Sequence, residues 1–154
     1  MLSLLEDTAL AATIQVPQVA GYDFEAVPNF ADMATRKRLS PPAVRGFFRI
    51  AAKWHIRDED ARLLLGGISS GSFYSLKKNP RALDQDTLTR ISLIVGIFKA
   101  LNILYSSRLA DAWITLPNTN PMFHGNTPLA YMQRLGLPGM MHVRQLLDAR
   151  RGGQ

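Results

Sequence analysis

The pattern of apolar positions changes character after residue 39. Residues 1–39 alternate short apolar clusters with turn formers such as Pro17 and Gly21, and they show no sustained period. We expect them to form a poorly ordered or loosely docked N-terminal extension. From Ser40 the spacing becomes helical, because Ser40 suits an N-cap and Pro41 suits the first helical position. Apolar residues then follow at helical spacing: Val44, Phe47, Phe48, Ala51 and Trp54.

Two shorter helices are predicted next. Asp58, Glu59 and Asp60 place negative charge where the positive end of a helix dipole would lie, and Gly66 and Gly67 would end that helix. A metal or acid/base cluster is the alternative interpretation of the acidic triplet. Adjacent helical residues point in different directions, so a helix start is favoured. A third helix is expected from Ser69 or Ser70 to Lys78, where Asn79 and Pro80 stop it.

A long and very apolar helix is predicted from Asp84 to Tyr105. Its apolar positions recur every three or four residues, and Ile97, Ile103 and Leu104 widen the stripe until little polar face remains. Such a helix must be covered on most sides, so we expect it to lie between domains or in a homodimer interface formed by residues 84–105. Its longest apolar stretch is interrupted by polar residues and looks too short to span a bilayer.

The remaining pattern is also helical. Leu109, Ala112 and Trp113 indicate another short helix, and Thr127 with Pro128 forms a cap and first position for a helix that Gly136 ends. A last helix would turn Val143, Leu146 and Leu147 inward and end near Arg150, with Gly152 as its terminator. No strand pattern competes. The sequence predicts an all-α fold with an extension (1–39), a helix-turn-helix domain (40–83) and a C-terminal helical domain (84–154).

Composition and charge narrow the class of protein. The 154 residues are 47% hydrophobic and 19% charged, as expected for a folded chain with one ordinary core or two small ones. The absence of cysteine excludes disulfides and thiolate chemistry and fits the cytoplasm. Of the net charge of +6, residues 40–82 carry +5. Such a field attracts polyanions, nucleic acid above all, although a solvated basic surface is the simpler interpretation of charge alone.

The segment around Gly67 has the features of a DNA-binding helix pair. Phe73 and Leu76 would bury one face of the third helix, and the residues on its other face can bind base edges or phosphates. Leu63 departs from the usual pattern, which has a small residue there, and suggests a wider helix crossing. The candidate DNA-binding residues are Ser69, Ser70, Ser72, Tyr74, Lys77 and Lys78.

The same segment contains the G-x-S-x-G pattern of serine hydrolases at residues 67–71. That pattern marks a nucleophile only between a strand and a helix of an α/β sheet, and a leucine-rich helix precedes it here. His55, His124 and His142 lack an evident acid partner and are scattered, so they indicate neither a triad nor a metal site. We expect no enzymatic activity, no metal and no cofactor.

Several short motifs in one order carry a resemblance to a known family. They are Arg90-Ile91-Ser92, Gly96 to Leu101, Ala112-Trp113-Ile114, Pro117-Asn118, Phe123, Gly125, Thr127-Pro128-Leu129, Gly136, Val143-Arg144, Leu147 and Gly152-Gly153. With these motifs, residues 90–153 resemble the C-terminal toxin-binding domain of the Xre/MbcA/ParS antitoxins. With the helix-turn-helix included, the resemblance covers residues 40–153.

The resemblance implies a type II antitoxin. Its partner would be a RES-domain toxin that degrades NAD or transfers ADP-ribose, and its C-terminal end would enter the NAD pocket of that toxin. The implied toxin-binding residues are Arg144, Leu147, Arg150, Arg151, Gly152 and Gly153. The residues alone also allow a frayed tail whose basic groups suit the helix dipole. Family members often repress their own operon as well.

A second class of function remains open at this point. The chain could be a helix-turn-helix regulator whose C-terminal domain only dimerises, with no toxin partner. Operators read by this motif usually require two-fold partners, so a homodimer is expected in either case.

Overall fold

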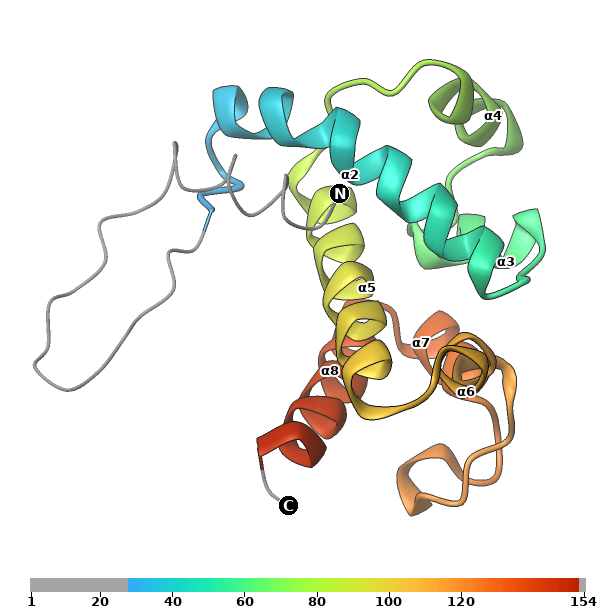
Figure 1. The fold of residues 1–154 in the computed structure, drawn as a ribbon. Coiled ribbons are helices and arrows are strands. Elements are labelled where there is room, and N and C mark those ends of the chain that lie inside the picture. The colour runs from blue at the N-terminus through green and yellow to red at the C-terminus, as the bar shows by residue number, and fades with distance from the viewer. Residues whose placement is uncertain (1–27, 153–154) are drawn as a thin grey trace, which may run out of the picture.

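A computed structural model of the protein describes residues 28–152 (Figure 1). Its helices are α2 (Met33–Lys53), α3 (Asp58–Leu64), α4 (Ser70–Lys78), α5 (Gln85–Leu104), α6 (Ser107–Ala112), α7 (Pro128–Leu135) and α8 (Leu137–Gly152), with 3₁₀ turns at η1 (Trp113–Thr115) and η2 (Pro121–Phe123). No strand occurs within this range, so the predicted all-α fold is confirmed.

Helix α5 is the element around which the rest is arranged. In Figure 1 it runs through the middle of the molecule, with α2 across its upper part and α8 beside its lower part. Ile91, Ile94 and Ile97 are completely buried within one continuous apolar core that reaches from α2 to α8. One side of α5 is thus covered by α2 and α8, in line with the expected position between two halves, whereas Ile103, which widens the stripe, is 57% exposed. A homodimer through residues 84–105 stays a prediction.

The length of α5 requires a correction to the membrane argument. With 20 residues, α5 is long and apolar enough to cross a bilayer. The interruptions in its apolar stretch therefore do not exclude a membrane span. A core helix meets the same criterion, however. Half of its most apolar window is buried inside the fold, against α2 and α8. The helix is therefore weak evidence for a membrane span.

The start of α2 differs from the prediction. The helix begins at Met33, where the Asp32 carboxylate accepts a hydrogen bond from the Thr35 backbone N–H at 3.0 Å. The predicted start at Ser40 is wrong, and Pro41 and Pro42 lie inside the helix. Ser40 is buried, and its hydroxyl donates to the Arg36 carbonyl (2.5 Å) and accepts from the Leu83 N–H (2.9 Å). The helix continues through both prolines and across the expected boundary after residue 39, and Leu39 beside them is buried as well.

The other helix starts follow the sequence closely. Ser69, Asp84 and Thr127 cap α4, α5 and α7 through side-chain hydrogen bonds. Helix α8 is longer than predicted, because it already begins at Leu137 and ends at Gly152 rather than near Arg150. The expected disorder of the N-terminal extension concerns mainly residues 1–27, which lie outside the described residues.

Candidate functional site

Helices α3 and α4 form the predicted helix pair around a glycine turn. Gly66 and Gly67 adopt φ values of +95° and +77°, which residues with a Cβ rarely adopt. Phe73 and Leu76 of α4 are buried, as predicted. Leu63, whose size suggested a wide crossing, is 49% exposed and points away from the core, so its bulk does not separate the helices.

The six candidate DNA-binding residues divide into two groups. Ser69 caps α4 by accepting from the Ser72 N–H (3.1 Å), and the two hydroxyls are hydrogen-bonded to each other at 3.0 Å. These two serines therefore already have structural partners at the start of the helix. Ser70, Tyr74, Lys77 and Lys78 are all exposed on the outer surface of α4, and we call these four the α4 surface.

Two residues of the α4 surface, Tyr74 and Lys77, contact neighbouring helices. The Tyr74 hydroxyl donates to the Asp58 carboxylate at 2.8 Å, and this hydrogen bond with the negative charge of Asp58 raises the pKa of Tyr74. The single O–H donor of Tyr74 is thus directed at Asp58, and its oxygen can still accept a hydrogen bond. The Lys77 ammonium lies 5.6 Å from the centre of the Phe48 ring of α2, a cation–π geometry.

Helix α8 is held against α5 by its apolar side. Val143 and Leu147 are completely buried. Leu147 was predicted as a toxin-binding residue, but a side chain with no exposed area anchors its own helix and presents no contact surface. Its predicted role therefore has to be corrected from direct contact to support of α8.

The basic residues of α8 are engaged within the chain. Arg144 forms an ion pair with Asp148 at 2.9 Å, and a Cβ added at Gly96 of α5 would collide with its guanidinium, so Arg144 fills the space that this glycine leaves. Arg150 donates to the Tyr105 hydroxyl at 2.9 Å, which contradicts the expectation that Arg150 is free to extend. Arg151, 3.9 Å from Asp148, and Gly152 are exposed at the helix end. Gly153 lies outside the described residues.

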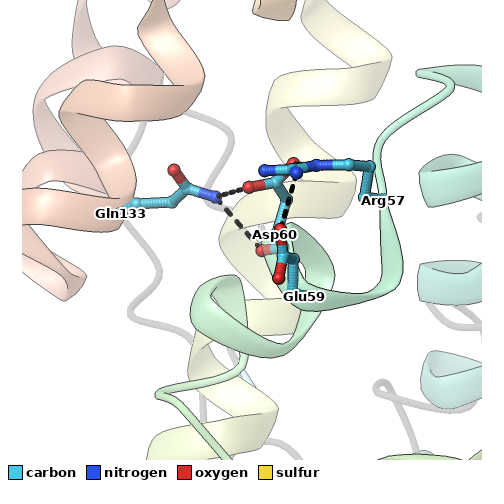
Figure 2. Close-up of polar contacts among 4 residues, drawn as sticks. All are labelled: Arg57, Glu59, Asp60 and Gln133. Atoms are coloured by element: carbon cyan, nitrogen blue, oxygen red, sulfur yellow. Dashed lines mark hydrogen bonds and ion pairs between the residues drawn. The ribbon is translucent and has the colours of Figure 1, made fainter.

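A polar contact connects the two halves of the molecule. Figure 2 shows Gln133 of α7 directed at Asp60 of α3, with its amide donating to the Asp60 carboxylate (3.0 Å) and carbonyl (3.3 Å). Arg57 approaches the same carboxylate at 3.2 Å. Burial alone would raise the pKa of Asp60, but the hydrogen bonds from Gln133 and Arg57 outweigh it and lower the pKa below its ordinary value.

Arg90 forms a second connection. It is ion-paired with Asp86 at 2.8 Å, and its guanidinium lies beside two glycines that both have positive φ, Gly66 of the α3–α4 turn and Gly136 of the α7–α8 turn. A Cβ at either glycine would lie within 3.6 Å of the Arg90 guanidinium. One side chain of α5 therefore contacts both turns.

The catalytic alternatives find no support in this geometry. Ser69, the serine of the hydrolase-like pattern, is the cap of α4 in a helix pair and does not follow a strand. Over residues 28–152, no three His, Asp or Glu side chains gather as they would around a metal ion.

Comparison with known proteins assigns both halves. Residues 34–96 match the antitoxin Xre-like helix-turn-helix domain, and residues 100–153 match the antitoxin Xre/MbcA/ParS C-terminal toxin-binding domain. The chain belongs to the Xre/MbcA/ParS antitoxin family. It is also 40% identical to the uncharacterized protein y4oB of Sinorhizobium fredii over 114 residues, which are 73% of this chain and 87% of that protein. As an Xre/MbcA/ParS antitoxin with a toxin-binding domain, it has a toxin as its partner.

The two matched regions of the antitoxin meet within α5, between residues 96 and 100, whereas the sequence pattern placed the boundary between residues 83 and 84. Helix α5 is therefore shared by the two regions. The first match begins at residue 34, which agrees with the start of α2 at Met33.

Sequence reasoning missed the residues that join the two halves of this antitoxin. Gln133 and Asp60 are 73 positions apart, so no local pattern connects them. Arg90 was part of the family resemblance, but its contact with Gly66 and Gly136 required the fold. One signal was present: each of these glycines ends a predicted helix, and such ends often require positive φ.

Proposed function

We propose that the antitoxin neutralises a RES-domain toxin that consumes NAD or transfers ADP-ribose, and that the C-terminal end of α8 enters the toxin active site. The observation that carries the proposal is the position of Arg151 and Gly152. They are exposed at the end of a helix whose preceding turns are anchored by Val143, Leu147 and the Arg150–Tyr105 hydrogen bond.

An anchored helix end suits this mechanism. The fixed part of α8 would define where the end points, so that little conformational entropy is lost when it enters a cavity. An arginine beside glycine backbone offers donors for the polar groups that line a nucleotide site. The proposed toxin contacts are thus Arg151, Gly152 and Gly153, with Arg144 and Arg150 contributing after they leave their internal partners.

Co-expression with the product of the adjacent open reading frame, which the proposal expects to be a RES-domain protein, tests the proposal. Deletion of residues 152–154 or Arg151→Glu should restore growth arrest by the toxin, because the end of α8 that enters the active site is shortened or carries the wrong charge. Gln145→Ala is the matched control and should still neutralise the toxin, since it changes an exposed residue of the same helix without changing its anchors or its end. Full neutralisation of the toxin by both the deletion variant and Arg151→Glu would refute the proposal that the end of α8 enters the active site.

We also propose that the antitoxin represses its own operon through the α4 surface, as a two-fold dimer in the cytoplasm. Lys77→Ala with Lys78→Ala should weaken binding to the upstream DNA and reduce its salt dependence, because each lost phosphate contact lowers the slope by about 0.9. The same variant should still neutralise the toxin. Light scattering of the purified protein measures whether it is a dimer.

The alternative, a regulator without a toxin, predicts that no RES-domain protein co-purifies with the chain. The match of residues 100–153 to a toxin-binding domain favours the antitoxin. A pulldown with the neighbouring gene product separates the two.

A further inference from the structure

A row of basic residues on α2 lies outside the surface that the sequence predicted for DNA. Arg45, Arg49 and Lys53 are spaced four residues apart and therefore share one side of the helix. All three are exposed, and we call them the α2 stripe. Helix α2 contains no acidic residue, and no carboxylate between residues 28 and 152 lies within ion-pair distance of the stripe.

The stripe is an unfavourable arrangement for folding alone. Like charges four residues apart on a helix destabilise it, and here two such pairs follow each other. The nearest acidic residues along the chain are on α3, and they have other partners. Glu59 and Asp60 pair with Arg57, and Asp58 accepts from Tyr74. The positive charge of the α2 stripe is thus available to bind an anionic partner outside the chain.

The stripe adjoins the α4 surface. Phe48 lies three residues after Arg45 and one before Arg49, and its ring is the one that Lys77 of α4 approaches at 5.6 Å. The same ring packs edge-on against Phe73 of α4 at 5.1 Å. In Figure 1, α4 lies directly beside the second half of α2. The ammonium of Lys77 therefore reaches α2 at Phe48, the residue that precedes Arg49.

We propose that the α2 stripe binds the phosphate backbone of duplex DNA next to the groove that α4 occupies. This inference rests on the DNA-binding part of the proposed function. From Arg45 to Lys53 the stripe is about 12 Å long at 1.5 Å per residue, which is about a third of a turn of B-DNA. Contacts of this kind position the protein and carry no base specificity.

The salt dependence of DNA binding tests the stripe. The full chain is titrated against a labelled duplex of mixed sequence, about three helical turns long, at several salt concentrations. Arg45→Ala with Arg49→Ala should lower the slope of log affinity against log salt by about 1.8. Between about 50 and 200 mM salt, wild-type affinity should therefore fall about 12-fold more than that of the variant.

Two controls accompany the stripe variant. Arg108→Ala with Arg134→Ala removes the same charge from exposed positions of α6 and α7 and should leave the slope within about 0.5 of wild type. Arg45→Lys with Arg49→Lys should restore the wild-type slope, because phosphate contacts need only the point charge. Circular dichroism should show the same helix content for all variants, since every changed side chain is exposed.

The outcomes separate this inference from the proposed function. An unchanged slope for the stripe variant, with a lower slope for Lys77→Ala with Lys78→Ala, overturns the stripe and leaves α4 binding intact. A stripe variant that binds DNA normally but no longer co-purifies with the toxin makes the stripe a protein interface, which also overturns it. If the wild type does not bind DNA at all, both the stripe proposal and the autoregulation proposal are overturned. Toxin neutralisation is measured in a separate assay and is not affected by that result.

Discussion

The basic residues of α4 and those of α8 differ in what surrounds them. Lys77 and Lys78 are exposed, and within the part of the chain that the structure describes neither has a carboxylate partner. On α8, Arg144 lies against Asp148 and Gly96, and Arg150 is bonded to Tyr105. A polyanion can thus bind Lys77 and Lys78 without breaking an ion pair, whereas a partner of Arg144 or Arg150 must first replace polar contacts within the chain. The first arrangement suits non-specific affinity, and the second suits recognition of one shaped partner.

The largest expected effect comes from removing the anchor of α8. Leu147→Ala should lower the free energy of unfolding by about 2–5 kcal/mol, because Leu147 is completely buried. Toxin co-purification should fall while DNA binding persists below the unfolding transition. Urea denaturation followed by circular dichroism gives the stability. Met141→Ala, on the exposed side of the same helix, is the control, and equal losses for both variants would show that α8 is not anchored as described.

A smaller effect is expected at the start of α5, which both regions share. Asp84 caps the helix by accepting from the Thr87 N–H at 2.7 Å, and hydrogen bonds from Thr87 lower its pKa. Asp84→Ala should cost about 1 kcal/mol of unfolding free energy. Since the folded-state pKa is lowered, the ionised cap contributes its stability above the unfolded value near 3.9 and loses it as the pH falls through the folded-state pKa.

Asp84→Asn isolates this titration, because an asparagine caps equally well and does not ionise. The melting temperatures of wild type and Asp84→Asn should diverge between about pH 5 and pH 2, with the wild type losing more. Parallel curves over that range would show that Asp84 is not the titrating cap.

The Gln133–Asp60 contact between the two halves should contribute about as much to the free energy of unfolding as the Asp84 cap, or less. Gln133→Ala should lower the free energy of unfolding by about 0.5–1.5 kcal/mol, because Asp60 loses a hydrogen-bond donor at a partly buried position. Gln145→Ala, at an exposed position of α8, should change it by less than about 0.5 kcal/mol. Chemical denaturation measures both. If the two variants behaved alike, the two regions would not be coupled through Gln133.

The smallest change in the free energy of unfolding is expected for a substitution at Gly96. In wild type, Gly96→Ala should change the stability by less than about 1 kcal/mol, because better helix propensity offsets the displacement of Arg144. In an Arg144→Ala background the same change should stabilise by about 1 kcal/mol, since the space is then empty. A double-mutant cycle from urea denaturation gives the coupling. Additive effects would show that Arg144 does not depend on the space at Gly96.

Sequence reasoning succeeded where the determinants are local. The caps Ser69, Asp84 and Thr127, and the glycines that end α3 and α7, each act within a few residues of themselves. The start of α2 was missed because Pro41 normally favours a helix start, and the support for Ser40 comes from Leu83, 43 positions away.

The binding surfaces were predicted less completely, because periodicity shows which side chains are exposed but not which partners they have. Periodicity identified the exposed side of α4, but it could not show that Ser69 and Ser72 are bonded to each other. It correctly turned Leu147 inward, while the family resemblance assigned the same residue to the toxin. The partner of Arg150 is Tyr105, 45 positions away, and only the packing of α8 on α5 brings them together.

The position of Arg90 has a consequence for chimeric antitoxins. A chimera that exchanges the toxin-binding region at the junction of the two matched regions, between residues 96 and 100, keeps Arg90 and Gly66 but replaces Gly136. A donor residue with a Cβ at that place would be strained by the positive φ of Gly136 (+67°), in the turn that Arg90 contacts, even though the Cβ itself would meet the guanidinium only in ordinary van der Waals contact. Partner exchange in this family should therefore succeed only when the donor supplies a glycine where Gly136 stands, however well the rest of its surface fits.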